Sequence, residues 1–343
     1  MVKVDTRAAQ RDVPRTHDVS PVERLHALLA RDMEATDRLI HERMGSAVAL
    51  IPDLARHLID SGGKRLRPML TLAAGRLGGY DGIAHIKLAA AVEFIHTATL
   101  LHDDVVDAST LRRGKVTANL VWGNKPSVLV GDFLFSRAFQ LMVETDSIRV
   151  LDILAGAAAI IAEGEVMQLK SANNLAATED HYLQVVSAKT AALFAAAAES
   201  GAVVSGRDAP FVTALRDFGQ NLGIAFQLVD DALDYSGRQA LMGKSVGDDF
   251  REAKVTLPVI LAYARADTAS QSFWQRAIES GRQSESDLER AITMVEATGA
   301  IRDTMSRARH YADRARDALS SFPDSDIRAA LCDIADFCVE RAY

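Results

Sequence analysis

Apolar residues recur at spacings of three and four along nearly the whole chain after residue 20, and clusters of Gly, Pro, Asn and Asp interrupt them. This spacing places apolar side chains on one face of an α-helix, whereas a half-buried strand needs strict alternation. Long Ala-rich runs and few alternations of β-branched residues favour helix as well. The pattern therefore predicts an all-helical protein of about ten helices.

Two segments, residues 86–101 and 218–229, are apolar nearly all the way round. Helices of this kind belong at the centre of a larger helical assembly. The chain after about residue 265 is more evenly charged, which is typical of peripheral amphipathic helices. Residues 1–20 are polar and predict a flexible tail. Because no shift in composition follows, we expect residues 21–343 to form one helical domain.

The composition is that of an ordinary folded protein, since 48% of the 343 residues are hydrophobic and 25% are charged. Asp and Glu outnumber Lys and Arg by 46 to 39, and the formal charge of -7 argues against a nucleic-acid partner. No uncharged apolar stretch reaches the roughly 20 residues that cross a bilayer. Residues 1–20 also lack the apolar segment of a secretory signal. We therefore expect a cytoplasmic protein with no membrane span.

The motif Asp-Asp-x-x-Asp occurs at residues 103–107 and again at residues 230–234, and each copy follows an apolar run. On a helix, the first and last aspartates of a copy lie on one face, so each copy is expected to present a pair of carboxylates. Such pairs can hold a hard divalent cation and leave positions open for phosphate oxygens. One copy alone could be a solvated helix end. Two copies favour a magnesium site.

Two basic clusters could bind phosphate that the metal does not cover. Residues 61–68 read SGGKRLRP, a Gly-rich turn with three basic residues, and residues 112–115 read RRGK directly beyond the first aspartate motif. Backbone N–H groups and arginine forks both match phosphate geometry. Either cluster taken alone could be a solvated loop.

Three further features point to the same site more weakly. His96 lies seven residues before Asp103 and thus on nearly the same helical face, although a histidine on an apolar helix is more often a core residue. Residues 243–254 form a Gly-containing segment with two lysines that could close over phosphates, or a surface loop. Lys189 precedes an apolar run and is the weakest candidate.

At this point the sequence resembles a known family. The segments GGKRLRP, FIHTATLLHDDVVD, RRGK, GDFLF, GEVMQL, FQLVDD and GKSVGDDFREAKVTLP occur in this order. They are similar to the trans-isoprenyl diphosphate synthases, and most closely to the long-chain polyprenyl diphosphate synthases of quinone side-chain biosynthesis. The resemblance covers about residues 22–265, and the two aspartate motifs together with GGKRLRP make it specific.

The resemblance implies a single antiparallel helical bundle around a central catalytic cavity. It implies a prenyltransferase that adds isopentenyl diphosphate repeatedly to an allylic primer such as farnesyl or geranylgeranyl diphosphate. Three Mg²⁺ ions per active site and a homodimer follow from the family. We expect octaprenyl to decaprenyl products for a quinone side chain, and a long apolar product suggests transient membrane contact during release.

The resemblance also assigns roles to residues. The metal ligands are Asp103, Asp107 and Asp230, and the catalytic set adds Asp104, Asp231, Lys189 and Lys244. The allylic diphosphate contacts Arg112, Lys189, Lys244 and Lys254, with Gln227 nearby. The isopentenyl diphosphate contacts Lys64, Arg67, His96 and Arg113. Product length depends on Ala98 and Thr99, which are small where short-chain relatives carry aromatic residues, above a tunnel whose walls include Ala74, Ile95, Val150 and Leu154.

Three other functions compete with this interpretation. A terpene cyclase also ionises a metal-bound diphosphate but normally lacks the second aspartate motif and the GGKRLRP cluster. A catalytically silent partner subunit usually loses aspartates from one motif, and both are complete here. A module that binds lipid diphosphates without turnover would differ in releasing no diphosphate.

Overall fold

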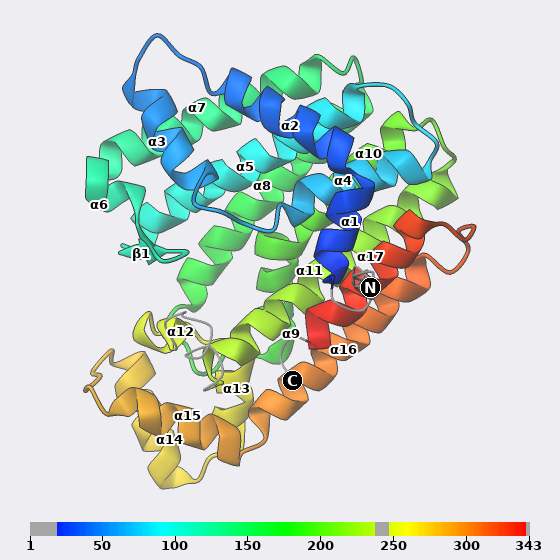
Figure 1. Cartoon of the computed structure of the whole chain (residues 1–343). Helices are drawn as coiled ribbons and strands as arrows, with labels where there is room; N and C mark the ends of the chain where they lie inside the picture. Colours follow the sequence, from blue (N-terminus) through cyan, green and yellow to red (C-terminus); the bar gives the residue numbers. More distant parts are fainter. Residues whose placement is uncertain (1–18, 237–246, 341–343) are drawn as a thin grey trace, which may run out of the picture.

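The computed structural model describes residues 19–236 and 247–340, and α-helices make up nearly all of their regular structure (Figure 1). The prediction of an all-helical protein is confirmed, although the helices are more numerous and shorter than expected. In the first half of the chain the helices are α1 (Pro21–Leu28), α2 (Ala30–Arg43), α3 (Leu50–Ile59), α4 (Leu66–Leu77), α5 (Ala84–Val106), α6 (Ala118–Trp122), α7 (Asn124–Val143) and α8 (Ile148–Ser171). In the second half they are α9 (Glu179–Val186), α10 (Ala192–Val204), α11 (Ala209–Asp234), α12 (Asp248–Arg251), α13 (Leu257–Ala264), α14 (Thr268–Trp274), α15 (Asp287–Ala297), α16 (Ala300–Ala318) and α17 (Asp326–Glu340), with two π-helical turns, η1 (Ser187–Ala191) and η3 (Gln275–Glu279).

The two segments that are apolar all the way round form α5 and α11, and both helices lie at the centre of the bundle, as predicted. Helix α5 packs against α4, α7 and α10, and α11 packs against α10 and α16. Side chains on every face of α5 are buried, from Leu88 to Leu101. Helix α11 begins at Ala209 because Asp208 accepts a hydrogen bond from the backbone N–H of Phe211, and Pro210 occupies the first turn.

The later helices cover one side and one end of this core. Helix α16 buries a single face of small residues such as Ala308 and Ala312 and exposes charged residues on the other face, as expected for a peripheral helix. Helices α12 to α15 form the lower part of the molecule in Figure 1. Helix α17 packs against both α16 and α1, and Arg24 of α1 pairs with Asp333 of α17 at 2.6 Å.

The second basic cluster forms a small structure that the sequence did not predict. Strands β1 (Leu111–Arg112) and β2 (Lys115–Val116) pair in antiparallel fashion. The connecting residues Arg113 and Gly114 have φ angles of 52° and 76°. A two-residue hairpin turn of type I′ requires positive φ at both central positions. This turn type is favoured because the twist of its backbone matches the twist of the two strands.

Within the described ranges, no helix is both long and apolar enough to span a bilayer. The predicted flexible tail falls mainly on residues 1–18, which lie outside the described residues. The division into a tail and one helical domain therefore stays a prediction.

Candidate functional site

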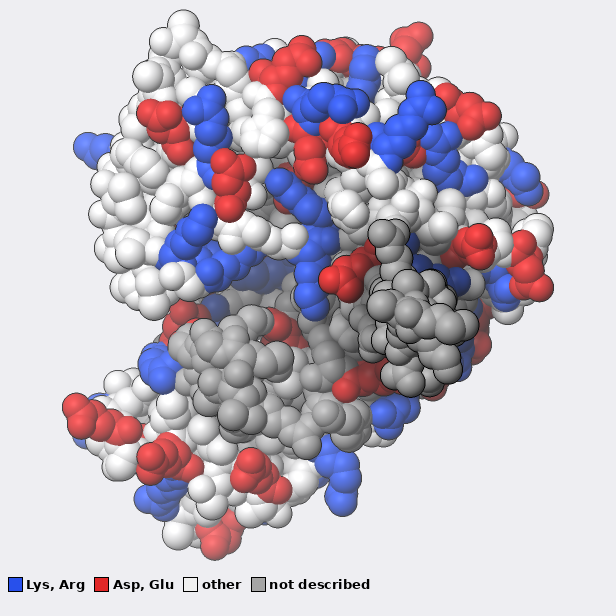
Figure 2. Space-filling model, viewed as in Figure 1, with Lys and Arg blue, Asp and Glu red and all other residues white. Residues whose placement is uncertain are grey.

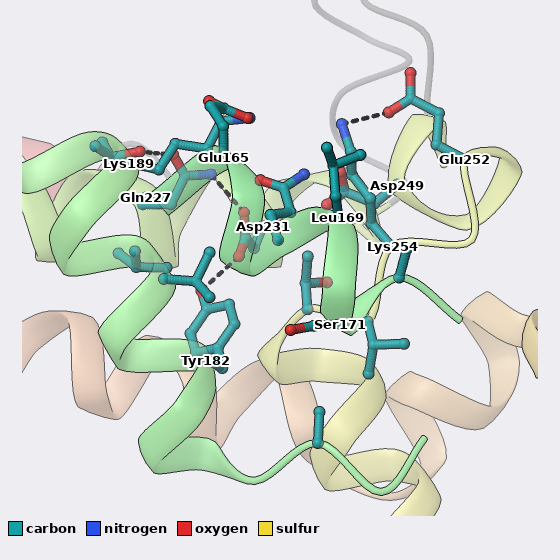
Figure 3. A pocket seen from close by; sticks show the side chains of 18 of the residues that line it. Glu165, Leu169, Ser171, Tyr182, Lys189, Gln227, Asp231, Asp249, Glu252 and Lys254 are labelled. Carbon is teal, nitrogen blue, oxygen red and sulfur yellow. Dashed lines mark hydrogen bonds and ion pairs between the residues drawn. The ribbon is translucent and has the colours of Figure 1, made fainter. Parts of the chain in front are cut away.

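The two aspartate motifs lie at the C-terminal ends of the two central helices. Asp107 caps α5, and Asp234 is the last residue of α11. Beside them is a cavity of about 390 Å³ whose walls come from α8, α9, η1, α11 and residues 249–256. In Figure 3, Glu165, Lys189 and Gln227 lie at one side of this cavity, and Glu252 and Lys254 lie at the other.

In the first copy, the outer two aspartates meet lysines from distant parts of the chain. Asp107 Oδ2 lies 3.1 Å from Lys254 Nζ, and Asp103 Oδ2 lies 3.9 Å from Lys189 Nζ. Burial raises the pKa of Asp103, and the neighbouring Asp107 raises it further against the opposing effect of Lys189. Lys189 therefore compensates the charge of this carboxylate only in part.

The middle aspartate of the same copy pairs with an arginine and not with a lysine. Asp104 is 1% exposed and accepts a hydrogen bond from Nε of Arg112 at 2.6 Å. Burial raises the pKa of Asp104, and Arg112 opposes that rise. Asp104 therefore holds the arginine that the sequence assigned to the allylic diphosphate.

The middle aspartate of the second copy also has protein partners. Asp231 accepts hydrogen bonds from the Tyr182 hydroxyl at 2.5 Å and from Gln227 Nε2 at 2.7 Å. The Gln227 carbonyl accepts in turn from Thr190 Oγ1 at 3.0 Å, so the amide orientation is fixed. Burial raises the pKa of Asp231 to about 7, although the Tyr182 and Gln227 bonds lower it.

The last aspartate of the second copy is bound by the backbone of a later segment, and its expected pairing with Asp230 stays a prediction. The Asp234 carboxylate accepts hydrogen bonds from three successive backbone N–H groups, of Gly247, Asp248 and Asp249, at 3.0–3.2 Å. Burial raises the pKa of Asp234 to about 6 against these bonds. The last aspartates of the two copies therefore have different partners: Lys254 pairs with Asp107, and the backbone of residues 247–249 binds Asp234.

Lys189 is presented by an irregular helical turn. It lies in η1, and a π-helical turn of this kind is frequent at functional sites. Its Nζ is 2.7 Å from Glu165 Oε2 on α8, one residue after Gly164. A Cβ on Gly164 would lie 2.8 Å from the backbone N of Lys189, so α8 and η1 approach closely only because this residue is glycine. Burial raises the pKa of Glu165, and so does Asp103.

The two basic clusters meet near His96, about two turns before Asp103 along α5. Nη1 of Arg67 lies 3.2 Å from His96 Nε2, and the Arg67 guanidinium carbon lies 4.3 Å from the centre of the Phe194 ring. The Arg113 guanidinium donates to the carbonyl of Gly62. Lys64 is exposed, and its Nζ lies 5.6 Å from the centre of the Phe337 ring. Lys and Arg side chains gather along the edge of the upper body that faces the lower part (Figure 2).

This cluster is short of negative charge. Desolvation lowers the pKa of Arg67 to about 10, with Arg113 lowering it and a nearby carboxylate, Glu93, raising it. Desolvation also holds the pKa of His96 far below its ordinary value, and the surrounding arginines lower it further. His96 is therefore neutral near pH 7, and the arginines carry the positive charge. An anion with several oxygens is the ligand that such a cluster favours.

The structure thus brings together most of the residues that the sequence singled out, in two groups that lie about two turns apart along α5. Lys244 lies outside the described residues. Ala98 is fully buried and Thr99 is half-buried below the first motif, and neither lines the cavity. The walls predicted for the tunnel, Ala74, Ile95, Val150 and Leu154, are buried as well.

Sequence reasoning gave no role to several residues that the geometry places in the site. Tyr182 is the main example, since it belongs to no motif and reaches Asp231 from 49 residues away. Glu252 lines the cavity and pairs with Lys254 at 2.5 Å. Asp249 also lines the cavity, and burial holds its pKa well above the usual range. Glu252 and Asp249 lie inside the segment 243–254, which offered a signal, whereas Tyr182 offered none.

Among the described residues, no three His, Cys, Asp or Glu side chains converge closely enough to form a complete metal cage. The donor set nevertheless fits Mg²⁺, because this ion is usually bound by one or two carboxylates together with substrate phosphates. Asp103, Asp107 and Asp230 would supply the oxygen donors, and a cation beside Asp103 would offset the burial that raises the pKa of this carboxylate. These aspartates are therefore suited to a metal that arrives with a phosphate ligand.

Comparisons with known proteins agree on one family. A sequence profile described as polyprenyl synthetase matches residues 48–295. The octaprenyl diphosphate synthase of Escherichia coli (strain K12) is 44% identical over 320 residues, which are 93% of this chain and 99% of that protein. The crystal structure of a decaprenyl diphosphate synthase from Rhodobacter capsulatus has a TM-score of 0.91 at 57% identity and covers 94% of this chain and 100% of that one. A polyprenyl synthase from Caulobacter crescentus CB15, complexed with calcium and isoprenyl diphosphate, has a TM-score of 0.91 at 56% identity, with coverage of 96% and 100%.

The close approach of α8 to η1 predicts a specific effect on stability. The Gly164→Ala variant would force the Cβ into the backbone of Lys189, and we expect it to lower the free energy of unfolding by about 1–3 kcal/mol. Gly156→Ala is the matched control, because Gly156 lies on the same helix and a Cβ added there would meet no atom within 4 Å. That control should raise stability by about 0.5–1 kcal/mol. Urea denaturation followed by circular dichroism measures both, and equal changes in the two variants would contradict the packing argument.

Proposed function

This chain belongs to the polyprenyl synthetase family, and we propose that it condenses isopentenyl diphosphate repeatedly with an allylic diphosphate primer to make a long all-trans polyprenyl diphosphate. It is an enzyme of the prenyltransferase class, since its relatives at high identity and coverage are polyprenyl diphosphate synthases. The octaprenyl and decaprenyl products named for those relatives support a role in making a quinone side chain.

One observation carries the proposal. The central helix α5 has a carboxylate and lysine group at its C-terminal end and an arginine and histidine group two turns earlier on nearly the same face, so two anion sites of different electrostatic design lie side by side along one helix. A reaction between two diphosphates in which only one diphosphate leaves requires this difference. The leaving diphosphate needs concentrated positive charge, and the retained diphosphate needs only to be held.

We assign the allylic substrate to the carboxylate and lysine group. Asp103, Asp107 and Asp230 would hold Mg²⁺, which supplies positive charge to the leaving diphosphate when it is bound. The calcium and isoprenyl diphosphate bound to the Caulobacter crescentus relative support a metal and diphosphate site in this family. The number of three ions stays a proposal from the resemblance.

The lysines of this group would change partners when substrate binds. Lys189 pairs with Glu165 and Lys254 pairs with Asp107 and Glu252 in the substrate-free protein. Arriving phosphate oxygens offer them an anion of higher charge, and Arg112, held in place by Asp104, adds a third contact. Lys244 and Gln227 complete the contacts that the resemblance assigns to this diphosphate.

We assign isopentenyl diphosphate to Lys64, Arg67, His96 and Arg113, which would bind its head group without metal. The double bond of this substrate attacks the allylic carbon as the C–O bond breaks, and a proton then leaves to the departing diphosphate. No protein nucleophile is required. The role of the protein is to align the two substrates and to exclude water from the allylic cation.

We propose that the enzyme is a homodimer, with α7 and α8 in the interface. Large apolar side chains are exposed on these helices, with Leu129 66%, Val143 63% and Ile148 81% exposed. Scattered exposed apolar residues are ordinary, but several on two adjacent helices indicate a surface that another copy covers. A cytoplasmic location and transient membrane contact during release of the product stay predictions from the sequence.

The reaction predicts a product ladder that depends on Asp103. Purified protein with Mg²⁺, farnesyl diphosphate and labelled isopentenyl diphosphate should give prenols that end at one long product after hydrolysis and extraction. We expect Asp103→Ala to lower turnover by at least about a hundredfold, because the leaving diphosphate loses its positive charge. No product from the unchanged protein with any allylic primer would instead support a silent partner subunit.

The position of Ala98 predicts control of product length. Ala98→Phe should shorten the final product by one or more isoprene units, because the resemblance places the product tunnel beside Ala98 and a ring there would block it. Ala98→Ser is the control of similar size and should leave the length unchanged. Chromatography of the extracted prenols measures both, and an unchanged length in Ala98→Phe would remove Ala98 from the tunnel.

The proposed interface predicts a change of mass in solution. Leu129→Glu should convert a dimer into monomers, because it places a charge in an apolar contact. Leu28→Glu is the control, since Leu28 is an exposed apolar residue of α1, with 41% exposure. Sedimentation or light scattering measures the mass, and a dimer that survives Leu129→Glu would place the interface elsewhere.

A further inference from the structure

The central helix contains a buried carboxylate to which the proposed function gives no role. Glu93 lies in α5 within the run Ala89–Ile95, whose other members are all apolar, and it is 6% exposed. It precedes His96 by three residues and therefore lies on nearly the same face of the helix. A buried carboxylate is costly unless it is paired, so its partners indicate why it is present.

The direct partner of Glu93 belongs to the GGKRLRP segment. Oε1 of Glu93 lies 2.5 Å from Nη1 of Arg65. Arg65 has a φ angle of 48°, a left-handed conformation that is strained for any residue other than glycine, and it caps the N-terminus of α4. The pair therefore fixes the turn from which Lys64 and Arg67 extend on either side of Arg65.

Glu93 is also the counter-charge for the guanidinium groups around it. Arg67 and Arg113 both experience a favourable electrostatic interaction with Glu93, which raises the pKa of each against the effect of desolvation. Arg113 and Arg67 repel each other, and Arg65 repels Arg113. Without a carboxylate at this point, three guanidinium groups would converge with no fixed anion among them.

We propose that Glu93 is a positioning residue of the metal-free diphosphate site, acting through Arg65 to hold Lys64, Arg67 and Arg113 in their binding arrangement. This inference rests on the proposed function, because it takes the diphosphate of isopentenyl diphosphate as the ligand. Glu93 does not touch the substrate. Its effect is therefore expected on binding of isopentenyl diphosphate and not on the allylic diphosphate.

The sign of the effect separates this role from simple electrostatics. If Glu93 only lowered the positive potential, its neutralisation would strengthen the binding of an anion. If Glu93 positions the turn, neutralisation leaves Arg65 with only the weaker contact to Asp37 at 4.0 Å and frees the strained turn, and binding of the anion weakens. We expect the second result, because the ligand needs several cations at fixed positions.

The experiment titrates isopentenyl diphosphate into the full-length protein by calorimetry in EDTA, so that the metal-dependent compartment does not contribute. Glu93→Gln keeps the size of the side chain and removes its charge. We expect the Kd to rise about tenfold, and in steady-state assays the KM for isopentenyl diphosphate to rise with it while the KM for farnesyl diphosphate stays within about twofold. Arg65→Gln should raise the Kd by a similar factor. The double variant should bind little more weakly than either single variant, because both changes break the same Glu93–Arg65 ion pair.

Asp32→Asn is the matched control for loss of a buried ion pair. Asp32 is 5% exposed and pairs with Arg76 at 2.6 Å, outside the candidate site. The Asp32→Asn variant should be less stable than the unchanged protein but should bind isopentenyl diphosphate with the same Kd. Binding by Glu93→Gln at the wild-type Kd or tighter would overturn the proposal, and Arg65→Gln gives the same test if Glu93→Gln does not fold. Failure of the unchanged protein to bind isopentenyl diphosphate or to form product would instead contradict the proposed function.

Discussion

The burial of charge in one helix is the constraint on which the rest of this structure depends. Helix α5 runs through the centre of the bundle, yet it carries Glu93, His96, Asp103 and Asp104 among apolar side chains. Each charged group there must have a partner of opposite charge, a hydrogen bond or a ligand. The partners come from α4, the β1–β2 hairpin and η1, so the packing of these elements around α5 is also what assembles the site.

The same constraint explains why two identical motifs are used differently. In both copies the middle aspartate is buried and has protein partners, Arg112 for Asp104, and Tyr182 and Gln227 for Asp231. A hydrogen bond from an arginine offsets the negative charge of a carboxylate more fully than hydrogen bonds from neutral groups do. What repeats between the copies is thus the placement of a motif at the end of a buried helix, and the surroundings decide which oxygens face the cavity.

The sequence was sufficient to predict the features that depend on local spacing. The helical class and the central position of residues 86–101 and 218–229 follow from periodicity, whereas the association of Arg67 with His96 was expected only from the family resemblance. It was not sufficient where the cause lies in distant contacts. Asp107 meets Lys254 across 147 residues, and the hairpin at residues 111–116 depends on positive φ angles that Arg113 and Gly114 suggest only weakly in a helical protein. Glu93 did offer a signal, because a lone carboxylate in an apolar run requires an explanation.

Under the proposed function, the two substrates present the same diphosphate, so recognition of that group alone cannot direct each substrate to its own place. The electrostatics of the two groups along α5 instead distinguish a diphosphate that carries metal from one that does not. Asp103, Asp107 and Asp230 repel a diphosphate that arrives without a cation, whereas Arg67 and Arg113 attract one. Only a diphosphate that carries metal neutralises the carboxylates, and the same metal then weakens its attraction to the arginines. Metal therefore assigns a different task to each site: the diphosphate held with metal lies beside the charge that assists ionisation, and the diphosphate held by arginines alone is retained. Which substrate enters which site must then depend on its hydrocarbon part.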